Sequence, residues 1–149
     1  MSIMNVSDAE LDSLKDDFNA QGYCRLLGIK VVNLKKGIAQ LSLCFNKNIL
    51  NKEATVHGGI ITSLADSAAA VALLSITGSE EKISSIELKI NFLRPVKNSD
   101  LFAEAKIIHK GSRTAVIEVD IKTKEEKLVA KCLLTFIILK ENKNSIFSD

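Results

Sequence analysis

One stretch of the sequence holds residue types that could do chemistry on a carbonyl group. In "NKEATVHGGIITSLADSAAA", residues 51–70, His57 precedes Gly58 and Gly59. If a helix begins there, its first amides lack partners within the helix and lie at the positive end of the helix dipole. Because glycine has no Cβ, a ligand carbonyl could approach these amides closely, as in an oxyanion hole. The alternative is that the glycines only turn a loop into a helix.

Asp66 is the second candidate for chemistry in this stretch. It is the only ionisable residue between His57 and Glu80, and it shares a narrow polar stripe with Thr62 and Ser63. Buried carboxylates are rare unless they are paired or used. A half-desolvated carboxylate is a candidate general base or nucleophile, whereas a solvent-facing one would have only a local structural role.

The spacing of these groups argues against a site within one chain. Seven residues separate Gly59 from Asp66, which is about 10 Å along a helix. The aspartate side chain leans back toward the helix N-terminus but recovers only a few ångströms. We therefore expect a composite site, with the oxyanion donors from one protomer and Asp66 from its symmetry mate.

A central helix must position both groups. Apolar residues recur with the 3.6-residue period of a helix over residues 59–76; they are Ile61, Leu64, Ala65, Ala68, Ala72, Leu73 and Ile76. Ser7 to Glu10 has the form of a capping box and predicts a short amphipathic helix over residues 8–20.

Strands are predicted on both sides of the central helix. "LLGIKVVNL" and "IAQLSLCF" flank a tight turn at Gly37, and residues 86–92 alternate with period two, which predicts a half-buried strand. The segments "DLFAEAKIIH", "TAVIEVDIKT" and "LVAKCLLTFIIL" follow, so the second half is predicted to be a meander of four strands. The fold class is α+β, with one antiparallel sheet of about six strands wrapped around the helix. Dimerisation would cover its exposed edge.

Bulk properties bound the function. Residues 1–149 are expected to form a single domain with a polar tail at about 141–149. No targeting segment or bilayer-length uncharged run is recognised, which predicts a cytoplasmic protein with no membrane contact. A net charge of +2 and 5% aromatic residues argue against nucleic-acid binding.

Metal and thiol chemistry are not expected. His57 and His109 lie far apart, and His109 is expected on the surface. The cysteines, Cys24, Cys44 and Cys132, are scattered and are expected to be buried, reduced and inert.

The motifs together resemble a known family. "NKEATVHGGIITSLADSAA", "SSIELKINFLRPV", "KGSR" and "VAKCLLTFIIL" are similar to segments of the hotdog-fold acyl-CoA thioesterases of the phenylacetate-degradation (PaaI-like) type. The resemblance runs from about Tyr23 to Lys140. It implies a hotdog fold and an enzyme that hydrolyses acyl-CoA to free acid and coenzyme A. It also implies a homodimer, or a dimer of dimers, with no metal or redox cofactor.

The resemblance also implies roles for individual residues. Asp66 would act as base or nucleophile across the dimer interface, and the Gly58 amide would polarise the thioester carbonyl. Asn51 and His57 would shape the site, and Ser85, or Ser84 as the alternative, would orient the attacking water. The residues implied to contact the coenzyme A part of the substrate are Gly59, Arg94, Lys97, Lys110 and Arg113.

Two departures and two rival functions stay open. Many relatives carry glycine where this chain has Ala54, which could alter the loop before His57, and Ser112 stands where a second basic residue is common. That second departure makes Arg113 a stronger phosphate contact than Lys110. A non-catalytic acyl-CoA-binding module would need no Asp66. A hotdog hydratase or dehydratase is disfavoured because Pro95 is the only proline.

Overall fold

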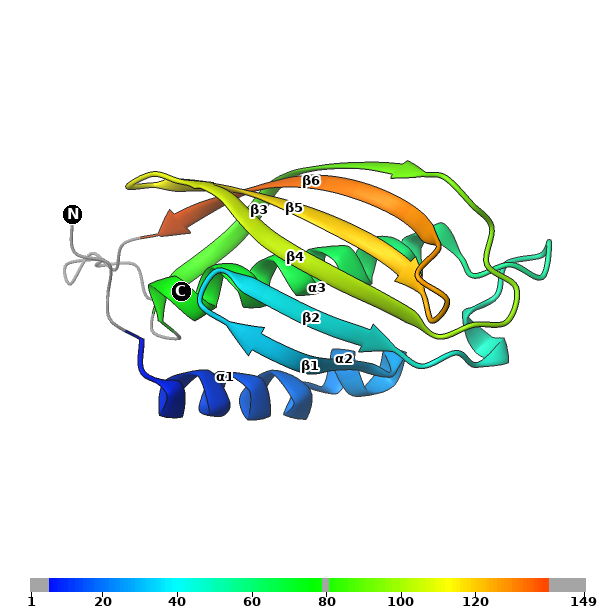
Figure 1. Cartoon of the computed structure of the whole chain (residues 1–149), viewed down its shortest axis with the longest axis horizontal. Coiled ribbons are helices and arrows are strands. Elements are labelled where there is room, and N and C mark those ends of the chain that lie inside the picture. The colour runs from blue at the N-terminus through cyan, green and yellow to red at the C-terminus, as the bar shows by residue number, and fades with distance from the viewer. Residues whose placement is uncertain (1–5, 79–80, 140–149) are drawn as a thin grey trace, which may run out of the picture.

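The computed structural model describes residues 6–78 and 81–139, and it has the predicted α+β fold. Six strands form one antiparallel sheet that curves around a long helix (Figure 1). In chain order the elements are α1 (Asp8–Ala20), α2 (Gly22–Leu27), β1 (Ile29–Lys35), β2 (Ile38–Leu43), the 3-10 helix η1 (Lys47–Ile49), α3 (Gly58–Thr77), β3 (Lys82–Phe92), β4 (Leu101–Lys110), β5 (Thr114–Thr123) and β6 (Leu128–Leu139). The predicted polar tail at 141–149 lies outside the described residues.

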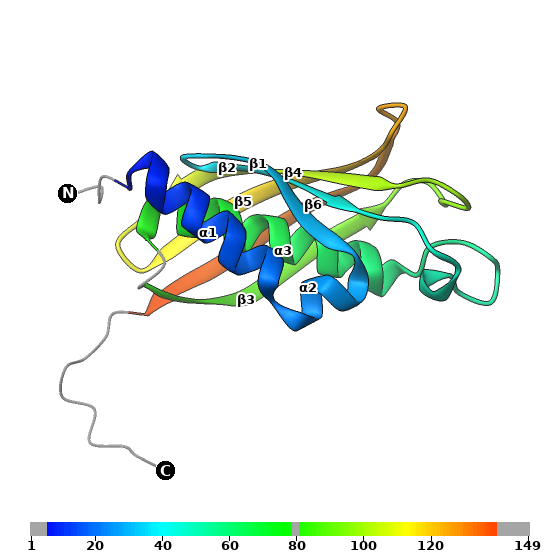
Figure 2. The ribbon, with the colours of Figure 1, turned by 90° about the horizontal axis from the view of Figure 1, so that it is seen from below.

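The N-terminal helix begins and ends as the sequence predicts. The Ser7 hydroxyl accepts a hydrogen bond from the Glu10 amide at 3.3 Å, and the Glu10 carboxylate accepts one from the Ser7 amide at 2.7 Å. This capping box fixes the first turn of α1. The buried stripe of α1, Leu11, Leu14 and Phe18, faces the rest of the molecule. Figure 2 shows α1 and α2 lying over β1 and α3.

Helix α3 fills the concave side of the sheet. Its buried apolar side chains include Leu64, Ala65, Ala68 and Leu73, and the small alanines let the helix approach the strands closely. By length and composition α3 is apolar enough to cross a bilayer, although Asp66 interrupts its uncharged run. Because this apolar surface is buried against the sheet, we assign α3 as the core helix.

The strand order corrects the predicted meander. The sheet runs β1-β2-β4-β5-β6-β3, so β4, β5 and β6 form a meander, but β3 pairs with β6 at the far edge. The chain leaves α3 at that edge, and residues 93–100 then cross the end of the sheet to reach β4 beside β2 (Figure 1). The hairpin between β1 and β2 is confirmed, with Gly37 at φ +77° in the turn.

Strand β3 forms an apolar edge of the sheet. Leu88 and Ile90 pack against the core, as the alternation predicts, but Ile86 and Phe92 are 57% and 52% exposed. A bulge between Ser85 and Glu87 interrupts the alternation, and no strand within residues 6–78 and 81–139 covers the outer side of β3. The half-buried prediction is therefore wrong for these two residues within a single chain.

Two local predictions are also corrected. Residues 22–27, part of which the sequence pattern assigned to the first strand, form α2, and Gly28 ends it in the left-handed conformation at φ +74°. Cys44 is exposed just beyond β2, whereas Cys24 and Cys132 are buried as predicted. Burial raises the pKa of the Cys132 thiol to about 11, so that thiol stays protonated.

Candidate active site

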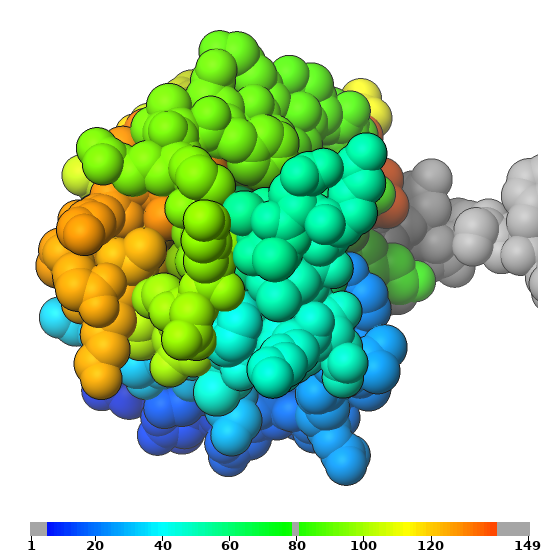
Figure 3. Space-filling model, turned by 90° about the vertical axis from the view of Figure 1, so that its right-hand side faces the viewer, coloured from blue at the N-terminus to red at the C-terminus, as the bar shows by residue number. Residues whose placement is uncertain are grey.

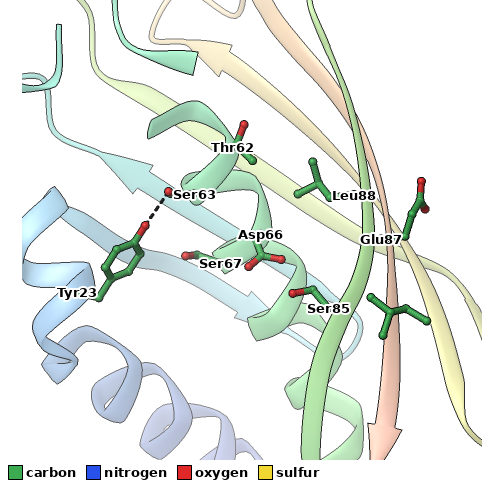
Figure 4. A pocket seen from close by; sticks show the side chains of 9 residues that line it. Tyr23, Thr62, Ser63, Asp66, Ser67, Ser85, Glu87 and Leu88 are labelled. Carbon is green, nitrogen blue, oxygen red and sulfur yellow. Dashed lines mark hydrogen bonds between the residues drawn. The ribbon is translucent and has the colours of Figure 1, made fainter. Parts of the chain in front are cut away.

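The first of two cavities along β3, here the acid pocket, lies between α2, α3 and β3. Its volume is about 390 Å³. Figure 4 shows Asp66 on α3 between Tyr23 on one side and Ser85 on the other. Hydroxyl and carboxyl side chains make most of the wall, which consists of Tyr23, Thr62, Ser63, Asp66, Ser67, Ser85, Ile86, Glu87 and Leu88.

Asp66 is held half-buried in the acid pocket. Its Oδ1 atom is buried and has no hydrogen-bond partner within the described part of the chain. Burial raises the pKa of this carboxyl above its ordinary value of 3.8, and the Ser85 hydroxyl partly offsets that rise. The structure thus brings Asp66 and Ser85 together, and Ser84 does not line the pocket. A buried oxygen with a free lone pair can accept a proton or attack an electrophile.

The second cavity, here the amide pocket, lies at the end of the molecule where α3 begins. Its volume is about 310 Å³, and its lining residues are Thr55, Val56, Gly58, Ile61, Phe92, Leu93, Arg94, Pro95 and Val96. The Val56 amide donates to the Val96 carbonyl at 2.7 Å, which joins the segment before α3 to the segment after β3. Figure 3 shows these two segments side by side on this face.

His57 is the N-cap of α3. Its Nδ1 atom accepts a hydrogen bond from the Gly59 amide at 2.9 Å. A Cβ on Gly59 would lie 3.0 Å from that nitrogen, so a larger residue would push the imidazole out of the cap. The Gly59 amide is therefore occupied inside the cap. In this arrangement His57 positions the first turn of α3, and it does so through the lone pair of Nδ1, which accepts the hydrogen bond.

The cap leaves one amide of the first turn free. The amides of Ile60 and Ile61 both donate to the His57 carbonyl, at 2.9 and 3.3 Å. In residues 6–78 and 81–139, the Gly58 amide has no acceptor. A Cβ on Gly58 would lie 3.2 Å from Cζ of Phe92, so the missing side chain lets the Phe92 ring cover this backbone. The two glycines thus serve different purposes, and Gly58 carries the available donor.

Asn51 organises the loop that leads to His57. Its Oδ1 atom accepts from the Glu53 amide and from both the amide and the hydroxyl of Thr55, at 3.0 to 3.1 Å. Ala54 in this loop has φ +56°, a conformation that glycine adopts without strain. The departure noted at Ala54 therefore falls on a left-handed position. The structure shows Asn51 holding the loop, while its predicted contact with substrate or water stays a prediction.

The acid pocket and the amide pocket share no lining residue among those described. Gly58 and Asp66 are eight residues apart on α3, or about 12 Å along its axis. One chain therefore holds the carboxylate and the free amide in separate cavities, as the spacing predicts.

The predicted basic residues also fall into two groups. Arg94 follows β3, where its amide donates to the Val129 carbonyl and its Nε donates to the Leu128 carbonyl at 3.0 Å. Lys97 is exposed on the same crossing segment. Arg113 accepts at its carbonyl from the Ile138 amide, beside the other end of β6, and Lys110 ends β4 in the same hairpin. Roughly 30 Å of strand separates the two groups.

His109 is exposed as predicted. Within residues 6–78 and 81–139, no three His, Cys, Asp or Glu side chains lie close enough together to bind a metal ion.

Two of the lining residues that the sequence pattern did not assign to the site, Tyr23 and Phe92, matter most for its shape. Tyr23 is the only tyrosine of the chain. It lies in α2, whose last two residues, Leu26 and Leu27, the pattern assigned to a strand, so no helix was predicted around it. Phe92 was assigned to the core side of a strand, and only the tertiary structure shows it against Gly58.

Comparisons with known proteins agree on one superfamily. Residues 53–130 match the model of the thioesterase superfamily. The acyl-coenzyme A thioesterase PaaI of Escherichia coli is 35% identical over 107 residues, which covers 71% of this chain and 74% of that protein. The 1,4-dihydroxy-2-naphthoyl-CoA hydrolase of Listeria monocytogenes is 28% identical and covers 82% and 99%. The solved structure of the E. coli PaaI protein has a TM-score of 0.82 at 26% identity, with 91% of this chain and 97% of that chain covered.

Proposed function

The chain belongs to the thioesterase superfamily, and from that premise we propose that it hydrolyses an acyl-CoA at a site shared by two protomers. Water and the thioester would give the free acid and coenzyme A. The observation that carries this proposal is that each of the two pockets of one chain holds only part of a hydrolytic site. Among the described residues, Asp66 has a buried oxygen without a hydrogen-bond partner and Gly58 has an amide without an acceptor, but the two groups lie in different cavities of one chain.

The edge strand supports the dimer in this proposal. The outer edge of β3 has no neighbouring strand in the described part of the chain. Ile86 and Phe92 on β3 and Leu93 just after it are exposed, and such an edge is stabilised by pairing with another strand. Antiparallel pairing of two β3 strands about a two-fold axis near Ile90 would set Ile86 opposite the partner subunit's Leu93. The acid pocket of one protomer would then meet the amide pocket of the other.

The chemistry would divide between the two halves. The partner subunit's Gly58 amide would hold the carbonyl oxygen and stabilise the oxyanion as the tetrahedral intermediate forms. Asp66 would either deprotonate a water that Ser85 orients or attack the carbonyl itself to give a mixed anhydride. In both routes the carbon–sulfur bond breaks, and the coenzyme A thiolate leaves and takes a proton.

These two routes differ in where solvent oxygen enters. A single turnover in oxygen-18 water would place label in the Asp66 carboxylate if the mixed anhydride forms and water attacks its aspartyl carbonyl. Release of label only in the acid product, with unlabelled Asp66, would fit the general-base route. Mass spectrometry of the peptide that contains Asp66 distinguishes the two results.

The same dimer would assemble the phosphate contacts. Because antiparallel pairing reverses one β3 relative to the other, Arg94 and Lys97 of one protomer would approach the partner subunit's Lys110 and Arg113. Cationic side chains are the usual partners of coenzyme A phosphates. We further propose that no metal or redox cofactor takes part, that the dimers pair into a tetramer, and that the protein acts in the cytoplasm without nucleic-acid or membrane partners.

The test is thiol release from a panel of acyl-CoA thioesters, run with wild type and Asp66→Asn in parallel. We expect wild type to turn over at least one thioester, and Asp66→Asn to lose at least about 10²-fold in kcat, as expected for removal of a catalytic base. Asp120→Asn is the matched control, because Asp120 lies on the sheet paired with Lys131 at 2.7 Å. Wild-type binding without turnover would contradict hydrolysis and favour an acyl-CoA-binding module.

A further inference from the structure

One side chain of α2 lines the acid pocket on the side opposite β3. The Tyr23 hydroxyl lies 2.7 Å from the Ser63 hydroxyl oxygen of α3, and Figure 4 shows the ring reaching across toward that helix. The ring is 56% exposed, so side-chain packing holds it only in part. The hydrogen bond to Ser63 is therefore the main specific contact that sets its orientation.

The direction of this hydrogen bond follows from the partners of Ser63. The Ser63 hydroxyl donates its one proton to the Gly59 carbonyl at 2.9 Å. Its oxygen can then only accept, so the Tyr23 hydroxyl is the donor in the bond between them. Both the ring and its anchor are thus tied to the first turn of α3, and replacing either hydroxyl removes the same bond.

The proposed function fixes which part of the substrate meets Tyr23. The partner subunit's amide pocket and basic residues would approach Asp66 from the side of β3, so coenzyme A would leave in that direction. The acyl group must then run from Asp66 away from β3, toward Tyr23 and Ser63. Most of the wall there is polar, which gives a long alkyl chain little apolar surface to bury.

From this geometry we propose that Tyr23, anchored by Ser63, is the specificity-determining residue of the site. This inference rests on the proposed function. The ring stands in the path of the acyl group at the far side of the acid pocket and restricts the enzyme to short acyl groups. A long acyl chain would have to displace the ring and break its hydrogen bond. The substrate class is therefore short-chain acyl-CoA, and chains of a dozen carbons are disfavoured.

The test compares kcat/KM for butyryl-CoA and dodecanoyl-CoA. In wild type we expect the shorter substrate to be preferred. Tyr23→Ala should raise the dodecanoyl to butyryl ratio by about tenfold or more, because a pocket that excludes groups by size discriminates on this scale. Tyr23→Phe and Ser63→Ala should each raise this ratio by a smaller factor, and the two factors should be similar. The double variant should raise the ratio little more than either single variant, because both changes remove the same hydrogen bond.

Leu26→Ala is the matched control. Leu26 lies one turn further along α2 and is 79% exposed, but it does not line the acid pocket. We expect the dodecanoyl to butyryl ratio of kcat/KM in Leu26→Ala to equal that of wild type. A Tyr23→Ala ratio equal to that of Leu26→Ala would overturn the inference, as would a wild-type preference for dodecanoyl-CoA.

A binding experiment separates failure of this inference from failure of hydrolysis. The chain has one tyrosine and no tryptophan, so ultraviolet-excited emission reports Tyr23. S-butyl-CoA and S-dodecyl-CoA, which are thioethers, can be titrated into wild type and Ser63→Ala. Ser63→Ala should narrow the affinity gap between the two even if no thioester is turned over. An unchanged gap in a protein that hydrolyses butyryl-CoA would reject only the role of Tyr23.

Discussion

The acid pocket and the amide pocket lie along the same strand, but they offer a substrate opposite chemistry. The acid pocket presents a carboxylate among hydroxyl side chains, and its useful group is a side chain. The amide pocket presents a backbone donor among apolar side chains, and its useful group exists because a side chain is missing at Gly58. Each pocket has what the other lacks. In the proposed function, the two pockets are the two halves of one hydrolytic site.

Among the changes that separate the two pockets, removal of the Gly58 N–H should have the largest effect on kcat. Gly58 is the first residue of α3, where proline is tolerated, so Gly58→Pro deletes the N–H and keeps the helix. We expect kcat to fall by about 10² to 10³, the usual result of losing one oxyanion donor. Gly58→Ala is the control, because it crowds Phe92 in the same way and keeps the N–H. Equal losses in both variants would mean that crowding, and not the donor, decides the rate.

The Ser85 hydroxyl should have the next largest effect. Ser85→Ala removes a group that faces Asp66, and we expect kcat to fall by about tenfold or more, as for loss of a hydrogen bond to a charged group. The pKa of Asp66 should rise further, which moves the acidic limb of the rate profile to higher pH. Ser84→Ala, one residue away and outside the pocket, should match wild type in both measurements. A larger loss of kcat in Ser84→Ala than in Ser85→Ala would contradict the assignment of Ser85 as the partner of Asp66.

The Asp66 carboxyl links activity to stability. Burial raises its pKa above 3.8, so the folded chain holds this proton more tightly than the unfolded chain does. The destabilisation by ionised Asp66 is absent well below pH 3.8 and is complete once the pH exceeds the folded-state pKa. kcat/KM should fall as the pH drops through that raised pKa. At neutral pH, Asp66→Asn should melt about 2–4 °C higher than wild type, and a lower melting temperature would contradict the buried, uncompensated charge.

The smallest expected effect lies outside both pockets. Ala54→Gly relieves a left-handed residue at φ +56° in the loop before His57, and we expect a gain of about 1 kcal/mol in unfolding free energy. Glu126→Gly relieves φ +60° in the turn between β5 and β6 and should stabilise by a similar amount. Denaturant unfolding measures both. A loss of stability in Ala54→Gly alone would show that loop entropy outweighs the relieved strain.

The sequence predicted the parts of the site that local chemistry determines. The period of α3, the capping box of α1 and the isolation of Asp66 in a small apolar run are all local signals. The spacing of Gly58 and Asp66 on one helix was enough to separate them, because helical rise is constant. The distinct purposes of Gly58 and Gly59 were not predictable, since they depend on the rotamer of His57 and on the position of the Phe92 ring.

The parts that failed depend on contacts between distant segments. Local alternation cannot distinguish a strand beside its sequence neighbour from one at the far edge, so β3 was misplaced next to β4. Helix α2 is too short for periodicity to reveal, which hid Tyr23. The loop bonds of Asn51 were not predicted either, because an Asn side chain in a turn can bond the local backbone or a ligand, and the sequence alone does not distinguish the two.

The measurement that tests the shared site most directly is complementation between two inactive variants. Asp66→Asn and Gly58→Pro chains would be unfolded and refolded together, and acyl-CoA hydrolysis would be measured against each refolded alone. Half of the dimers would be mixed, and each would hold one intact site with Asp66 from one chain and Gly58 from the other. A site shared between protomers would give about a quarter of wild-type activity in the mixture. Mixed dimers as inactive as the separate variants would show that Asp66 and Gly58 act within one chain and would contradict it.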